Sequence, residues 1–300
     1  MSSSETIAFL VAAAILAFGG LIFNGFIVTV ITIEWTKSRS LSSIELLLLT
    51  LGLSNFWSSV LLTPFYINEY AMRIFSDLML QILFFINVFL AMSRFWFTAW
   101  LCVFYCIKIM NNTQKFFLWC KLRISWLIPR FLVGSLVFSF IPSFLASRNI
   151  WIQLQKNTTK NFTNMTQRKE LEHTLGALEI IFVVLGASGP LLVVLLCSIL
   201  VVTSLCRHSY RRMDKESNLR SPQTEACIKA AGTVLSLLFL YASFYLTHTL
   251  SMVVDLRIKK NPHFITLVFI AYPPAQATIL LLSNPKLKQA AAWMMQRRKP

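Results

Sequence analysis

Long apolar runs dominate the chain, and short polar stretches separate them. A helix needs about 20 apolar residues to cross the hydrocarbon core of a bilayer, and a pass for runs of that length finds seven. We expect these helices near residues 7–33, 44–67, 78–107, 125–147, 175–206, 230–254 and 263–283. The pattern therefore predicts an all-α membrane protein, with one seven-transmembrane helix bundle over residues 1–300 and no internal repeat.

The end of the last apolar run predicts an additional short helix. Pro285 has no backbone N–H, so it fits the first turn of a new helix. Apolar and polar residues then alternate at helical spacing, which predicts an interfacial helix over residues 285–296 on the inner leaflet. The alternative interpretation is a frayed basic tail.

Composition agrees with the apolar pattern. The chain is 56% hydrophobic, its mean hydropathy is +0.64, and its formal net charge is +16. The first apolar run could be read as a signal peptide, but it lacks a basic leader, contains Glu5 and is too long for a cleaved segment. We therefore expect a first spanning helix and a multi-pass protein of the plasma membrane.

The distribution of Lys and Arg predicts the orientation of the bundle. With the N-terminus outside, the inner loops and tail hold 17 of these residues and the outer loops hold 9, as the positive-inside rule requires. Three glycosylation sequons, at Asn157, Asn161 and Asn164, fall in the loop assigned outside. A further Asn-x-Thr at Asn111 falls inside and is expected to be a chance match. Basic loops facing anionic lipid explain the net charge without nucleic acid.

The sequence argues against several classes of protein. No nucleophile–base pair, phosphate loop or metal-ligand spacing is visible, so we expect no catalytic residues, no metal and no cofactor. The six cysteines avoid the outer loops, so no disulfide is expected there. A transporter usually has repeated halves and buried central acids, and neither is found. Seven helices with an outer N-terminus favour a G-protein-coupled receptor.

Short motifs along nearly the whole chain resemble those of the bitter taste receptor family. They include "NGFIV" from Asn24, "LCVFYCIKI" from Leu101, "SLCRHSYRRM" from Ser204 and "YPPAQATILLLSNPKLKQA" from Tyr272. Each motif is weak alone, but their common order is specific. The related pheromone receptors of the first vomeronasal type are the alternative. The chain departs from the family at Asn55, where an Arg is usual, at Gln276-Ala277 instead of His-Ser, and at Cys227 instead of His.

The resemblance implies that a small, mostly apolar bitter compound binds between the outer halves of helices 3, 5, 6 and 7. Counting from the matched motifs, and along the face of helix 6, gives the candidate contacts Asn87, Ala91, Tyr241, Phe244, His248, Thr266 and Phe269. The aromatic residues could instead pack helices together, and His248 could face lipid headgroups. Glu179 would attract cationic agonists if it faces the bundle; the alternative is exposure to headgroups.

The resemblance also implies a heterotrimeric G protein of the gustducin or transducin type as the partner at the inner face. The candidate surface is basic and comprises Lys108, Arg123, Arg207, His208, Arg211 and Lys229. Each of these residues could equally serve only the positive-inside bias.

Arg94 is a charge in the middle of the third helix, where insertion costs about 2.5–3.5 kcal/mol. We expect its side chain to face the interior of the bundle, with partners drawn from the oxygens of Asn24, Asn55 and Gln276 and from backbone carbonyls. The family's Arg in helix 2 is Asn55 here, so we predict that Arg94 fills the same central polar site from helix 3. The alternative is a local solution such as a trapped water.

Overall fold

The computed structural model describes residues 3–67, 75–110, 115–158, 186–206, 222–254 and 262–296. All regular structure within these residues is helical. Seven of the helices in these ranges are long and apolar enough to cross a membrane. The predicted fold class, an all-α seven-helix membrane bundle, is therefore confirmed.

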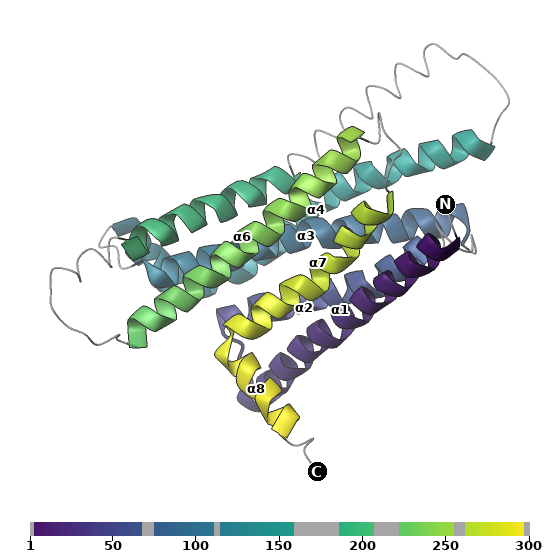
Figure 1. The fold of residues 1–300 in the computed structure, drawn as a ribbon. Helices are drawn as coiled ribbons and strands as arrows, with labels where there is room; N and C mark the ends of the chain where they lie inside the picture. Colours follow the sequence, from purple (N-terminus) through teal and green to yellow (C-terminus); the bar gives the residue numbers. More distant parts are fainter. Residues whose placement is uncertain are drawn as a thin grey trace.

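The helices lie along one another in a single bundle, in which α7 packs beside α1 and α2 and α6 packs beside α7 (Figure 1). Their bounds are α1 Ser3–Ser38, α2 Ser43–Ile67, α3 Asp77–Ile109, α4 Lys115–Thr158, α6 Pro222–Val254, α7 Pro262–Ser283 and α8 Pro285–Gln296. The fifth helix is described over Gly186–Cys206.

The fourth helix is longer than the apolar run over residues 125–147, because it continues into a half-apolar stretch with scattered Lys and Arg before residue 125 and into polar sequence after residue 147. Apolarity marks only the part of a helix that meets hydrocarbon, so it misses such extensions. Pro129 and Pro142 lie inside α4. Proline is tolerated there because neighbouring side chains in a membrane bundle can satisfy the freed backbone groups.

Small residues let the helices approach one another. α1 packs against α2 and α7, and α3 packs against α2, α4 and α6. A Cβ atom at Gly52 of α2 would lie 3.3 Å from Ile27 and 3.1 Å from Val28 of α1. This close contact is the usual way in which membrane helices associate, since lipid tails are as apolar as the side chains between helices.

Local hydrogen bonds end α1 and start α2 within a short connection. Arg39 has a left-handed backbone (φ 53°), and its N–H donates to the carbonyl of Trp35, which ends α1. Ser42 and Glu45 then form a capping box at the start of α2, since the Ser42 N–H donates to Glu45 Oε2 at 2.9 Å and the Glu45 N–H donates to Ser42 Oγ at 3.4 Å.

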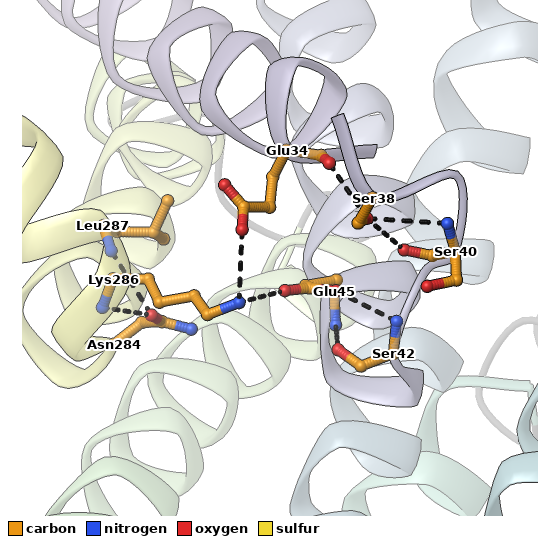
Figure 2. A network of polar contacts seen from close by, with 8 residues as sticks. All are labelled: Glu34, Ser38, Ser40, Ser42, Glu45, Asn284, Lys286 and Leu287. Atoms are coloured by element: carbon orange, nitrogen blue, oxygen red, sulfur yellow. Dashed lines mark hydrogen bonds and ion pairs between the residues drawn. The ribbon is translucent and has the colours of Figure 1, made fainter. Parts of the chain in front are cut away.

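α8 begins directly after α7 and turns away from the axis of the bundle (Figure 1). Asn284 caps it, because its Oδ1 accepts from the N–H groups of Lys286 at 3.0 Å and Leu287 at 3.3 Å. Lys286 Nζ lies 2.7 Å from Glu45 Oε1 and 3.8 Å from Glu34 Oε1, so one cation joins α8 to both α1 and α2 (Figure 2).

α8 has the two faces expected of a helix at a membrane surface. Leu287 is buried against the bundle, whereas Trp293 and Met294 are exposed. An exposed tryptophan and methionine on a short basic helix suit the boundary between lipid tails and headgroups.

Candidate functional site

Arg94 of α3 lies at the centre of the bundle with only 1% of its surface exposed. Its Nη1 donates a hydrogen bond to Oδ1 of Asn55 on α2 at 3.1 Å. The ring of Tyr272 on α7 lies beneath the guanidinium carbon, 4.9 Å from it. The charge therefore meets an amide oxygen and the negative face of an aromatic ring, both of which stabilise a cation.

Hydrogen bonds around Arg94 close into a ring that joins three helices. Asn55 Nδ2 donates to Oε1 of Gln276 on α7 at 2.9 Å. Gln276 Nε2 donates to Oγ1 of Thr98 on α3 at 2.7 Å, and the Thr98 hydroxyl donates to the backbone carbonyl of Arg94 at 2.7 Å. All four side chains are buried. We call this set of residues, Arg94, Asn55, Gln276 and Thr98, the polar ring.

In the described parts of the chain, no carboxylate pairs with Arg94. A buried cation without a counter-charge is costly, so the structure must hold its dipolar partners in place. The polar ring does this because each amide is fixed by a second bond. The Arg94 Nε still has no hydrogen-bond partner, so the site is not fully satisfied.

Asn24 of α1 completes the connection between helices at this level. Its Nδ2 donates to the carbonyls of Gly20 at 2.9 Å and Pro273 of α7 at 3.2 Å. Asn24 was expected among the partners of Arg94; in the structure its amide group ties α1 to the α7 backbone instead. α1, α2, α3 and α7 are all linked within one buried layer.

Aromatic side chains next to the polar ring connect it to α6. We call them the aromatic cluster, which comprises Phe95, Tyr241, Phe244, Phe269 and Tyr272. Phe95, the neighbour of Arg94, stacks on Tyr241 with centroids 4.5 Å apart, and Phe244 lies 4.8 Å from Tyr272 and 5.1 Å from Phe269. The Tyr241 hydroxyl donates to the carbonyl of Ala187 at the start of the described fifth helix. The cluster thus connects α3, α6, α7 and the fifth helix by side-chain contacts.

The remaining expected ligand contacts lie on α3 before Arg94 and on α7 before Tyr272, next to the polar ring and the aromatic cluster. Asn87 and Ala91 precede Arg94 on α3 by two helical turns and one, and both are half-buried. Asn87 Nδ2 donates to the carbonyl of Leu83 at 3.0 Å, but its buried Oδ1 has no hydrogen-bond partner. Thr266 is buried on α7, before Phe269. Tyr241 is fully buried and its hydroxyl is already bonded, which is the geometry of a packing residue beneath a site.

The basic residues expected at the inner face divide into two groups. Lys108 is exposed near the end of α3, and Lys229 is exposed in the first part of α6. Arg123 is exposed on α4, where its guanidinium lies over the ring of Trp119 at 5.5 Å. Other expected residues lie outside the described residues, namely Glu179, Arg207, His208, Arg211, Asn161, Asn164 and Asn111. Asn157 and His248 fall within α4 and α6, but their side chains are not described.

Comparison with known proteins decides the family. The profile of the taste receptor protein family matches residues 1–299. Taste receptor type 2 member 2 from Homo sapiens is 30% identical over 280 residues, which cover 91% of this chain and 90% of that protein. The chain belongs to the taste receptor type 2 family. Member 40 from Gallus gallus is 32% identical over 276 residues, or 90% of this chain and 88% of the relative.

Membership in the taste receptor type 2 family settles several expectations. The resemblance to bitter taste receptors is confirmed, and the pheromone-receptor alternative is not supported. With seven helices able to cross a membrane, the protein is a multi-pass receptor of the plasma membrane. The family is a G-protein-coupled receptor family and not a family of enzymes.

Sequence reasoning missed two members of the site. Thr98 lies one helical turn after Arg94, so a search for polar residues at that spacing would have found it. Tyr272 was visible only as part of a family motif, because the stacking of a ring under a cation on another helix depends on tertiary packing.

Proposed function

We propose that this taste receptor binds small, mostly apolar bitter compounds from the extracellular side and activates a G protein of the gustducin or transducin type. The proposal uses the predicted orientation, with the N-terminus outside. In that orientation Asn87, Ala91, Thr266 and Phe269 lie on the outer side of the polar ring. Lys108 lies on the inner side.

The unpartnered Oδ1 of Asn87 is the observation that carries the ligand site. A buried carbonyl oxygen without a hydrogen bond costs about 1–3 kcal/mol, so a donor supplied by a ligand would stabilise the site. Asn87 lies on the same face of α3 as Arg94, two turns away, and the aromatic cluster begins at Phe95. One polar handle beside aromatic side chains is typical of a small-molecule pocket.

The residues around this site favour neutral ligands. Asn87, Ala91, Phe244, Thr266 and Phe269 carry no charge, and Arg94 is enclosed by its own partners. Attraction of cationic compounds would depend on Glu179, which lies outside the described residues. If Glu179 acts in this way, Glu179→Gln should lower the potency of cationic agonists and leave that of neutral agonists unchanged. If both classes keep their wild-type potency in this variant, Glu179 has no such role.

Ligand binding is coupled to the inner face through the aromatic cluster. A compound against Phe244 would press on Tyr241 and Phe95, and Tyr241 is bonded to the fifth helix. Movement of α6 and the fifth helix at their inner ends would then admit the G protein. Basic residues such as Lys108 and Lys229 would line its docking surface, together with Arg207, His208 and Arg211.

A calcium-release assay with a promiscuous Gα subunit tests the ligand half of this proposal. A panel of bitter compounds is applied to cells with confirmed surface receptor, and Phe244→Ala is compared with Phe239→Ala. Phe239 is on the same helix but is 79% exposed, away from the cluster. We expect potency to fall at least tenfold in Phe244→Ala only. No response from the wild type, or equal losses in both variants, would contradict the proposed site.

Nucleotide exchange on purified Gα subunits tests the coupling half. We expect agonist-dependent exchange on a gustducin or transducin subunit, with smaller exchange when Lys108→Gln is introduced. Agonist-dependent solute flux without any exchange would instead indicate a transporter.

A further inference from the structure

The outward face of α4 carries a repeated pairing of tryptophan and arginine. The guanidinium carbon of Arg123 lies 5.5 Å from the ring centroid of Trp119, and that of Arg130 lies 3.4 Å from the ring centroid of Trp126. Each arginine follows its tryptophan by four residues, and the second pair repeats the first seven residues later. All four side chains are exposed. We call these four residues the Trp–Arg stripe.

The stripe lies on the side of α4 that is turned away from the bundle. The buried residues of α4 include Ile128, Leu132, Ser135 and Ser139. At about 100° per residue, the centre of the stripe lies roughly 180° around the helix from that face. Arg123 is one of the residues expected from the sequence in the candidate G-protein surface. Because Arg123 faces away from the bundle, we assign it to the Trp–Arg stripe instead.

The charge of the stripe is uncompensated within the described residues. Lys115–Thr158 contains no Asp or Glu. Glu34 and Glu45, which are described at the end where α1 stops and α2 starts, pair with Lys286. The arginines are held by the tryptophan rings, and Arg130 Nη1 also donates to the Trp126 carbonyl at 3.0 Å. Stacking leaves the remaining guanidinium edge available for an anion, which arginine prefers to bind through two parallel N–H groups.

The positions of the charges along the candidate span Leu118–Ser147 indicate the depth of the stripe in the bilayer. Residues 131–147 carry no charge, and at about 1.5 Å per residue they span about 26 Å, close to the thickness of a hydrocarbon core. Arg130 therefore lies at one boundary of the core, and Arg123 lies about 10 Å further out, at the level of lipid headgroups. With the proposed orientation, this is the inner leaflet, which carries anionic lipid.

An apolar track continues from the stripe into the hydrocarbon region. Val133, Val137, Phe140 and Phe144 follow on the same side of α4, and each is more than half exposed. A lipid headgroup on the arginines would place its acyl chain along these residues.

We propose that the Trp–Arg stripe binds one phosphoinositide of the inner leaflet, a lipid with a phosphate on its inositol ring. Two cations about 10 Å apart along the membrane normal are too far apart for a single phosphate. They match a lipid whose phosphodiester lies beside Arg130 and whose ring phosphate reaches Arg123. Phosphatidylserine has only the first of these phosphates, so it satisfies only half of the stripe.

Native mass spectrometry of the purified receptor tests this site, with phosphatidylinositol 4-phosphate as the probe. Phosphatidylinositol and phosphatidylserine are the comparison lipids, and soluble inositol phosphate tests the headgroup alone. We expect one retained phosphatidylinositol 4-phosphate, bound at least fivefold better than either comparison lipid, and no retained inositol phosphate. Equal retention of phosphatidylserine, or retention of the soluble headgroup, would overturn the assignment.

Matched variants locate the binding. Arg123→Gln with Arg130→Gln should lower retention at least fivefold, while Lys37→Gln with Arg39→Gln, which removes two exposed charges from the end of α1, should leave it unchanged. Equal effects of the two double variants would overturn the site. The inference uses the proposed orientation, but lipid binding in detergent does not depend on it. A failed lipid assay therefore leaves the orientation intact, and glycan mapping tests the orientation separately.

Discussion

Arg94 of α3 donates a hydrogen bond to Oδ1 of Asn55 on α2 at 3.1 Å. This contact is the one that the predicted exchange of the guanidinium from helix 2 to helix 3 requires, and the exchange itself stays a prediction. Asn55 accepts from Arg94 through its oxygen and donates to Gln276 through its amide nitrogen. A single residue therefore joins the charge on α3 to α7.

Loss of Arg94 should abolish signalling. Arg94→Ala removes the donor to Asn55 and leaves a buried amide oxygen unpaired, at a cost of about 1–3 kcal/mol. Transfer of the charge in the double variant Asn55→Arg with Arg94→Ser should recover part of the response. The calcium assay measures both, with surface labelling as the control for folding. A normal response from Arg94→Ala, at normal surface level, would contradict a switching role.

Removal of the hydroxyl of Tyr241 should loosen the contact between α6 and the fifth helix. Tyr241→Phe keeps the stack on Phe95 but loses the bond to the Ala187 carbonyl. We expect the unfolding free energy to fall by about 0.5–1.5 kcal/mol and basal signalling to rise. Thermal melting and ligand-free calcium release measure the two effects. Tyr245→Phe, on the same helix, is the control, and an equal change there would argue against a specific role.

The ion pair of Lys286 should hold α8 in place while adding little to stability. Its side chain is 64% exposed, so the pair contributes less than about 1 kcal/mol. Lys286→Glu should broaden the distance distribution between spin labels at exposed Met294 and Ile33, and the swap with Glu45→Lys should narrow it again. A distribution that is unchanged in Lys286→Glu would show that Asn284 and Leu287 position α8 alone.

The same ion pair has a defined dependence on pH. The hydrogen bond from Lys286 to Glu45 raises the pKa of Lys286 above its ordinary value of 10.5. A raised folded-state pKa means that the contribution is complete below pH 10.5 and is lost only as pH rises through the higher folded value. Spin-label distances for α8 should therefore not change between pH 7 and 9. A broadening in that range would mean that another group controls α8.

Glycan mapping should establish the orientation of the bundle. We expect glycans on one or more of Asn157, Asn161 and Asn164 and none on Asn111, because glycosylation occurs only on the lumenal side. Replacement of the three outer asparagines by Gln should remove the mass shift seen on glycosidase treatment. A shift that survives this change and disappears with Asn111→Gln would invert the orientation.

The sequence by itself determined the fold class, because the length and apolarity of seven runs satisfy the one strong requirement of a bilayer, that spanning backbone be helical. It also determined the start of α8, since Pro285 has no backbone N–H and fits the first turn of a new helix. Likewise, a charge as deep as Arg94 had to face the interior, whatever its partners.

Tertiary structure decided which partners those are. Asn24, Asn55 and Gln276 were equal candidates for Arg94, and only the packing of α2, α3 and α7 selects Asn55 as the direct contact and turns Asn24 toward the α7 backbone. The direction of Arg123 was also undetermined, because a charge count assigns a residue to a side of the membrane but not to a face of a helix. Contacts between helices depend on their relative rotation, which local sequence does not fix.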